Sequence, residues 1–81
     1  MAVKVDVTRS REVNQMVQEV IQTYGKVDIL VNNVGLSTLQ PFMENTEDYW
    51  DEIIAINLKG VILCSRAILD DMMKRKYGKI V

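Results

Sequence analysis

The run VDILVNNVG, from Val27 to Gly35, constrains the fold of this chain more than any other segment. It is an apolar stretch followed directly by two asparagines and, soon after, a glycine. Short apolar runs of this kind are typical of parallel strands that are covered on both faces. Ligands of open α/β sheets bind just beyond the carboxyl ends of such strands. We therefore expect Asn32, Asn33 and Gly35 to border a small-molecule site.

Regular patterns before this run predict a strand and a helix. The alternating valines of VKVDV predict a short strand over residues 3–7, with Asp6 at its carboxyl end. Apolar residues then recur at spacings of three and one over residues 9–24, which is the pattern of an amphipathic helix. Thr8 is the expected N-cap of this helix, and Gly25 is its expected C-terminal stop.

A second helical pattern covers residues 46–76. Thr46 or Asn45 is the expected N-cap, acidic residues occupy the first turn, and a basic cluster occupies the last turn, after which Gly78 would end the helix. A straight helix of this length is long for a compact domain. We therefore expect a bend near its middle, at Gly60.

The order of these elements predicts an α/β fold. An irregular stretch over residues 36–45 precedes the second helix, and a third strand opens at Lys79. Crossovers long enough to hold helices join parallel strands with right-handed connections. The β-α-β-α-β order therefore predicts part of a doubly wound parallel sheet of the Rossmann type. Three strands with two open edges would bury too little of the apolar surface, so we expect a segment of a larger domain.

Composition excludes several functional classes. The net charge of -1 gives no electrostatic footprint for nucleic acid. With no histidine and one cysteine, the chain has neither a metal-ligand cluster nor a disulfide framework, and a reducing compartment is expected. No apolar run approaches the roughly 18 residues of a membrane span, and the first residues lack a signal peptide's apolar core. We expect a soluble, cytoplasmic protein.

Polar groups at the strand ends form the candidate ligand site. If the first two strands are neighbours, Asp6 and Asn33 lie about one to two strand spacings of 4.8 Å apart at one sheet edge. The amides of Asn32 and Asn33 can donate to and accept from a purine or ribose, and Gly35 allows close approach of the backbone. The alternative is structural, with Asp6 as a turn or capping acid and the asparagines as loop residues.

Asn57 interrupts an apolar stripe of the second helix. A buried amide is costly unless its hydrogen bonds are satisfied. Asn57 therefore braces neighbouring backbone, holds a water or ligand, or does both at the bend. The rest of the stripe is expected to be core, with Cys64 as a small buried hydrophobe. The stripe residues are Trp50, Ile53, Ile54, Asn57, Val61, Cys64, Ile68 and Met72, followed by Met73 beside it.

A second apolar set widens the surface of the same helix. An apolar surface this wide covers more than the sheet, either in a contact between subunits or against an adjoining helix of the same chain. Its members are Ile56, Leu58, Ile62, Leu69 and Met73.

Three motifs in order resemble the central part of the classical short-chain dehydrogenase/reductase family. They are DVT at residues 6–8, VDILVNNVG, and IAINLKG around Asn57, and the resemblance extends to YGKIV at residues 77–81. It implies hydride transfer between a nicotinamide cofactor, NAD or NADP, and a carbonyl or alcohol. The residues that choose between NAD and NADP and those that select the substrate lie outside these motifs in the family.

The resemblance also implies individual roles. Asp6 matches the acid that contacts the adenine ring, with Val7 beside it. The turn of Asn32, Asn33, Val34 and Gly35 matches the family's NNAG turn at the adenine ribose, with valine in place of the usual alanine. Asn57 matches the asparagine of the catalytic tetrad, whose backbone binds a water of the proton relay. The helix over residues 46–76 resembles the one that forms the family's dimer interface, which implies a homo-oligomer.

Two parts of the family pattern fall outside the chain. The Gly-rich turn that holds the pyrophosphate would precede Met1, and the catalytic Ser and Tyr-x-x-x-Lys would follow Val81. In the family mechanism the Tyr is the acid/base and the Lys lowers its pKa. We therefore expect residues 1–81 to be the central segment of one NAD(P)-binding domain and to be inactive alone. The alternatives are a truncated, non-catalytic interaction or oligomerisation module and a flavodoxin-like domain, although no phosphate loop follows the first strand.

Overall fold

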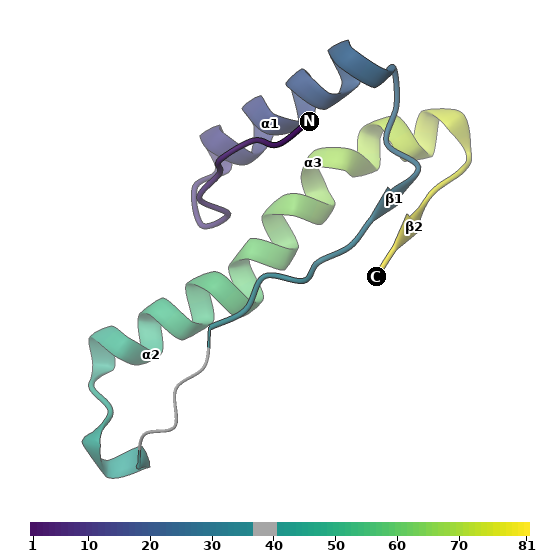
Figure 1. The fold of residues 1–81 in the computed structure, drawn as a ribbon. Coiled ribbons are helices and arrows are strands. Elements are labelled where there is room, and N and C mark those ends of the chain that lie inside the picture. Colours follow the sequence, from purple (N-terminus) through teal and green to yellow (C-terminus); the bar gives the residue numbers. More distant parts are fainter. Residues whose placement is uncertain (37–40) are drawn as a thin grey trace.

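The computed structural model describes residues 1–36 and 41–81. Of the predicted irregular stretch over residues 36–45, residues 37–40 lie outside the described part. The described elements follow one another in the order α1 (Ser10–Tyr24), β1 (Ile29–Leu30), a 3-10 turn η1 (Phe42–Glu44), α2 (Glu47–Ile54), a π-helical turn η2 (Ala55–Lys59), α3 (Gly60–Arg75) and β2 (Lys79–Ile80) (Figure 1). In this part of the chain, no helix is both long and apolar enough to cross a membrane.

β1 and β2 form a parallel two-stranded sheet. Ile29 is paired with Lys79 and Leu30 with Ile80. The Lys79 N–H donates to the Asp28 carbonyl at 3.0 Å, and the Asn32 N–H donates to the Val81 carbonyl at 2.8 Å. Because the connection between the strands carries α2, η2 and α3, the predicted α/β class and parallel crossover are confirmed.

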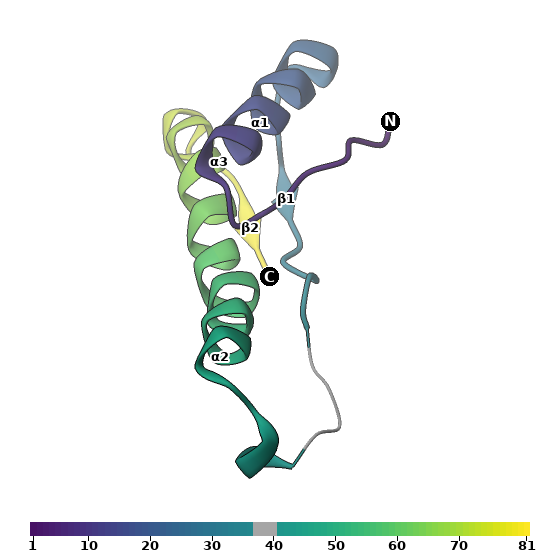
Figure 2. The same ribbon diagram turned by 90° about the vertical axis from the view of Figure 1, so that its left-hand side faces the viewer.

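The core lies between α1, α3 and β1. Val17 of α1 packs with Ile68 and Met72 of α3, and Leu30 of β1 packs against this cluster. Val13, one helical turn before Val17, is completely buried. Figures 1 and 2 show both helices on the same side of the strands. The apolar spacings that predicted the two helices therefore correspond to the faces that meet here.

The predicted strand over residues 3–7 is not formed. Within the described residues, no backbone hydrogen bond joins residues 1–6 to β1 or β2. A strand requires a partner for its backbone groups, and in a doubly wound sheet of order 3-2-1-4-5-6 two other strands separate the third from the fourth. The condition under which Asp6 and Asn33 would lie one to two strand spacings apart, that their strands are neighbours, is therefore not met.

Burial of β1 on both faces is also not observed. Ile29 is 55% exposed and Val31 is 60% exposed, whereas Leu30, which faces the helices, is partly buried. Regular strand structure is limited to two residues of the predicted run over residues 27–35. One face of the sheet is therefore open, because both described helices that pack on it lie on the other face.

The ends of α1 and the start of α2 follow local rules. Gly25 is the C-cap of α1 in the left-handed region, with φ 85°, as expected. Thr46 caps α2 by accepting a hydrogen bond from the Tyr49 N–H at 3.2 Å, as expected. Thr8, however, is not the cap of α1, because Arg9 occupies the N-cap position and the Thr8 hydroxyl donates to Asp6 at 2.7 Å.

The end of α3 differs from the prediction. Lys76, with φ 54°, is the left-handed C-cap, so Gly78 does not end the helix. Gly78 instead lies against Met72, whose side chain would overlap a Cβ at position 78. The lack of a side chain at Gly78 thus allows the chain to turn from α3 into β2 across a buried methionine.

The predicted interruption of the long helix is present, but its cause is different. The turn η2 separates α2 from α3, and the Gly60 N–H donates to the Ala55 carbonyl five residues earlier. Gly60 itself has helical dihedral angles and is buried. A Cβ at Gly60 would lie 2.8 Å from Cγ2 of Val7, so this glycine is required for close packing rather than for flexibility.

The expected core positions of the second helix are only partly buried. Cys64 and Met72 are buried as predicted. Trp50 is 39% exposed and stacks on Phe42, with ring centroids 5.4 Å apart. Met73 is 70% exposed, so its assignment to the core is wrong. α2 extends beyond α1 and the strands (Figure 1), which explains the exposure of Trp50.

Arg75 joins the end of α3 to the start of β1. Its guanidinium donates to the carboxylates of Asp71 and Asp28, both at 3.0 Å, and to the Val27 carbonyl. Partial burial raises the pKa of the Asp28 carboxyl, but the hydrogen bonds and charges of Lys26 and Arg75 outweigh it and lower the pKa overall. The crossover is thereby closed by a charge-assisted contact.

This contact predicts an acid-dependent contribution to stability. A carboxyl with a lowered folded pKa stabilises the fold fully above its ordinary value of 3.8, and the contribution is lost as the pH falls through the folded pKa. Asp28→Asn is expected to lower the melting temperature at neutral pH, with the difference from wild type shrinking below about pH 4. Melting curves across this range measure it, with Asp70→Asn, which removes an exposed acid that forms an ion pair with Arg66, as the control. A difference that stays constant with pH would contradict the assignment.

Candidate functional site

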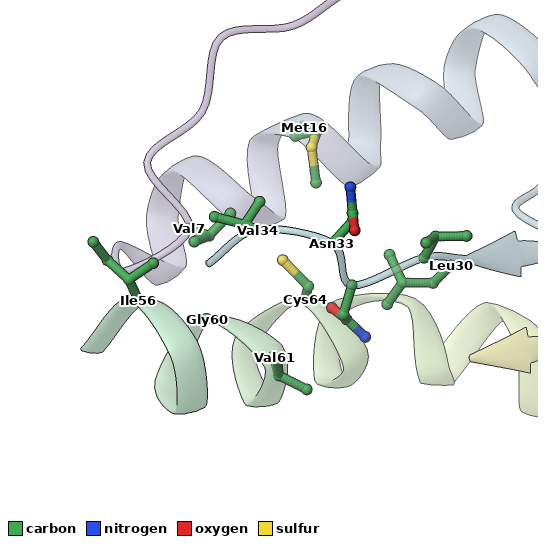
Figure 3. Close-up of a pocket in the computed structure, with 11 residues that line it drawn as sticks. Val7, Met16, Leu30, Asn33, Val34, Ile56, Gly60, Val61 and Cys64 are labelled. Carbon is green, nitrogen blue, oxygen red and sulfur yellow. The ribbon is translucent and has the colours of Figure 1, made fainter. Parts of the chain in front are cut away.

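An apolar pocket of about 190 Å³ lies between α1, the end of β1 and the start of α3. Figure 3 shows the side chains that surround it. Its lining residues are Val7, Met16, Leu30, Val31, Asn32, Asn33, Val34, Ile56, Gly60, Val61 and Cys64. Four of the residues predicted for the cofactor site are among them: Val7, Asn32, Asn33 and Val34.

The rim of the pocket is the strand-end turn. Asn32 is held in place because its N–H donates to the Val81 carbonyl at 2.8 Å, and the residue is partly buried. Asn33 and Val34 are exposed at the rim. Two amides beside an apolar pocket can bind the polar edge of a ring whose faces contact apolar side chains.

The floor of the pocket is built by one face of the helix. Ile56 comes from η2, and Gly60, Val61 and Cys64 come from the first turns of α3. Burial raises the pKa of the Cys64 thiol, which keeps it neutral at physiological pH. This floor offers no acid or base for proton transfer and favours an apolar ring.

Asp6 forms a turn beside the pocket and does not line it. One carboxylate oxygen accepts hydrogen bonds from the Thr8 N–H at 3.0 Å and the Thr8 hydroxyl at 2.7 Å, and the other accepts from the Arg9 guanidinium at 3.3 Å. The bonds from Thr8, and then the contact with Arg9, lower the pKa of Asp6. The structural alternative for Asp6, a turn acid, is therefore observed. The turn presents the next residue, Val7, to the pocket.

Asn57 braces backbone, which is the structural alternative left open by the sequence, but it is exposed and not buried as its place on the apolar stripe predicted. Its Oδ1 accepts from the Leu36 N–H at 2.8 Å, and its Nδ2 donates to the Leu36 carbonyl at 2.9 Å. A Cβ on Gly35 would lie 3.4 Å from the same Oδ1. Asn57 is part of η2 and does not line the pocket. π-helical turns are frequent at functional sites because they place a residue outside the regular helical register.

Two features of the site were missed by reasoning from the sequence. Met16 of α1 lines the pocket, although its spacing indicated only a helix face. Gly60 was expected to weaken a helix but instead admits Val7. The only signal for this role is its place three residues after Asn57 in the NLKG motif.

The expectation of no metal site remains untested for the whole chain. Among the described residues, no group of three or more His, Cys, Asp or Glu side chains is placed to hold a metal ion.

Comparisons with known proteins agree on one family. The family model described as short chain dehydrogenase matches residues 1–81. The 3-oxoacyl-[acyl-carrier-protein] reductase FabG of Staphylococcus epidermidis is 36% identical over 80 residues, which are 99% of this chain and 33% of that protein. The 5-keto-D-gluconate 5-reductase of Escherichia coli is 36% identical over 81 residues, which are 100% of this chain and 32% of that protein.

Solved structures have the same fold over nearly the whole of this chain. A short-chain dehydrogenase from Streptomyces avermitilis superimposes with a TM-score of 0.89 at 31% identity, covering 99% of this chain and 30% of that one. ElxO with NADP bound superimposes with a TM-score of 0.90 at 29% identity, covering 96% of this chain and 32% of that one. The chain thus spans about a third of the length of the relatives that it matches, and over all of that span it belongs to the short-chain dehydrogenase family.

Proposed function

We propose that residues 1–81 are the central segment of the NAD(P)-binding domain of an oxidoreductase that interconverts a carbonyl and an alcohol by hydride transfer. The observation that carries this proposal is the convergence of Val7, Asn32, Asn33 and Val34 on one pocket. Val7 and the turn at residues 32–34 are more than twenty positions apart in the sequence, and each lies in one of the motifs that resemble the family's cofactor motifs.

The cofactor would meet this segment with its adenosine half. Val7 and Val34 supply apolar contacts for a ring, the amides of Asn32 and Asn33 supply hydrogen bonds to a ribose, and the Gly35 backbone permits close approach. The lowered pKa keeps Asp6 ionised at neutral pH, so its less occupied oxygen can accept a bond from an exocyclic amine. When bound, the cofactor would supply or accept the hydride, while these residues bind and orient it.

Asn57 is proposed as the segment's contribution to catalysis. Its side chain is committed to Leu36, so its backbone in η2 is the group left to bind a relay water. The residues that line the pocket include no general acid or base. The proton transfer would therefore depend on the Ser and Tyr-x-x-x-Lys of the family pattern, and the chain alone would be inactive.

Similarity to named reductases supports the proposed reaction class. FabG of Staphylococcus epidermidis and the keto-gluconate reductase of Escherichia coli are both named as reductases, and ElxO holds NADP. We propose a carbonyl or alcohol substrate and either NAD or NADP as the cofactor. A cytoplasmic location, favoured by the single cysteine, belongs to the same proposal.

Activity and nucleotide binding of the purified chain test the proposal. With NADH or NADPH and a 3-oxoacyl thioester or a keto sugar, we expect no loss of reduced-cofactor absorbance. AMP, followed by NMR, is expected to bind with a Kd no tighter than about 1 mM, because the residues that line the pocket include no cation or Gly-rich turn to bind its phosphate. Its effects should be confined to the signals of the residues that line the pocket, Val7, Asn32, Asn33 and Val34 among them. Turnover would contradict inactivity, and identical shifts with ribose 5-phosphate would contradict adenosine binding.

A second candidate function is that of an interaction or oligomerisation module, favoured by the exposed apolar face of the long helix. Ile54, Leu58, Ile62 and Met73 are between 56% and 70% exposed. Acidic residues occupy the first turn of α2 and basic residues the last turn of α3, so a second copy packed antiparallel would bring opposite charges together. The same face is the proposed homo-oligomer contact of the whole enzyme. Sedimentation equilibrium distinguishes the two candidate functions. A defined, concentration-dependent dimer would favour the oligomerisation module, and aggregation would favour a segment that depends on the rest of its domain.

A further inference from the structure

We infer that Gly60 is a positioning residue that sets the distance between the two walls of the pocket. The inference rests on the proposed function for its ligand, an adenine nucleotide, but its geometry stands on the protein alone. One wall is the turn that carries Val7, and the other is the strand-end turn that carries Val34. Figure 3 shows both valines at the end of the pocket where Ile56 and Gly60 lie.

The first wall rests on Gly60. Cγ2 of Val7 would be 2.8 Å from a Cβ at position 60, and Cβ of Val7 would be 3.4 Å from it. Val7 therefore occupies space that any other residue at position 60 would need. The bonds from Thr8 to Asp6 hold the turn around Val7, so a shift of the Val7 backbone away from position 60 would strain them.

The second wall rests on Asn57. Both backbone groups of Leu36 are hydrogen-bonded to the Asn57 side chain, and Gly35 lies against its Oδ1. Leu36 follows Val34 by two residues, which leaves the strand-end turn little freedom to shift relative to the helix. This wall is thus attached to η2 by two hydrogen bonds rather than by packing alone.

The two attachments belong to one rigid unit. Asn57 and Gly60 are three residues apart, less than one helical turn of about 3.6 residues. The Gly60 N–H closes the π-helical turn by donating to the Ala55 carbonyl. A side chain at position 60 would therefore push on Val7 while in contact with the turn that holds Asn57, since its Cβ would lie 3.7 Å from the Ala55 carbonyl oxygen. The width of the pocket is set by this turn and not by two independent loops.

The test uses the 81-residue chain without any ligand. In Gly60→Ala we expect the Leu36 amide to exchange with solvent about tenfold faster, since overpacking of this size disturbs the turn that holds Asn57. The Gly25 amide, bonded to Ile21 far from the pocket, should keep its rate and so reports any global unfolding. Lys59→Ala, at the neighbouring exposed position, is the matched control and should leave Leu36 unchanged.

A double substitution makes the inference falsifiable even if Gly60→Ala unfolds. Val7→Ala removes the methyl group that meets the new side chain at 2.8 Å, so Val7→Ala/Gly60→Ala should return Leu36 exchange to within about twofold of wild type. An unfolded double variant, or unchanged Leu36 exchange in a folded Gly60→Ala, would overturn the inference.

An AMP titration of the same variants separates this inference from the proposed function. We expect Gly60→Ala to weaken AMP binding about tenfold and the double variant to recover only part of it, because Val7→Ala also removes an apolar contact with the ring. Failure of AMP to bind the wild-type chain would count against the adenosine site, while the exchange rates of Leu36 would still decide the role of Gly60.

Discussion

Ile68→Ala is expected to lower the free energy of unfolding by about 2–5 kcal/mol, the largest effect of any single substitution considered for this chain. Ile68 is 2% exposed and lies in the cluster that joins α1, α3 and β1. Domains have only about 0.05–0.15 kcal/mol of stability per residue, and a chain of 81 residues with an open sheet face has little to spare. At the low end of this range, about 4 kcal/mol for 81 residues, such a loss would leave a large part of the variant unfolded at room temperature.

Urea denaturation followed by circular dichroism measures this change. Ile62→Ala is the matched control, because it removes the same atoms from the same helix at a position that is 56% exposed. Its effect should stay within about 0.5 kcal/mol. Equal effects of the two substitutions would show that α3 is not packed as described.

Asn57→Ala is expected to release the strand-end turn. It removes both hydrogen bonds to Leu36, and losing them should raise the exchange rate of the Leu36 amide by about ten- to a hundredfold, as expected for roughly 1–3 kcal/mol of local stabilisation. The helices should persist, because the core contacts of α1 and α3 do not involve Asn57.

Two further variants identify the bonds responsible. Asn57→Asp keeps an acceptor for the Leu36 N–H but loses the donor to its carbonyl, so its exchange rate should be intermediate. Asn14→Ala, which removes an exposed amide from α1, should leave Leu36 unchanged. If the aspartate and alanine variants exchange alike, the bond from the Leu36 N–H contributes nothing measurable.

The helices were predictable because their signals are local. The spacings in α1, the stop at Gly25 and the cap at Thr46 depend on residues within one or two turns of one another. The end of α3 near Lys76 was predicted as well, but the residue responsible was not. Lys76 is the left-handed C-cap, and Gly78 instead packs closely against Met72.

The lining of the pocket was predictable in part, but its geometry was not. The sequence indicated Asp6, Val7, residues 32–35 and Asn57, and the structure places Val7 and Asn32–Val34 at one pocket. Asp6, Gly35 and Asn57 do not line it and are exposed. The sequence indicated that the Asn57 side chain needs hydrogen-bond partners. That these are the backbone groups of Leu36, 21 residues away in the chain, depends on how η2 packs against the strand-end turn.

The sequence by itself determined that this chain forms two amphipathic helical segments, the second of which connects two parallel strands. It also determined that polar groups follow a strand end in a pattern typical of short-chain dehydrogenases. Periodicity, caps and motifs are local, so composition and spacing are enough to establish them. Tertiary structure alone decided that residues 3–7 do not pair as a strand, that Asn57 braces Leu36, and that Gly60 admits Val7. These outcomes depend on contacts between segments distant in the chain, whose distances only the packed fold defines.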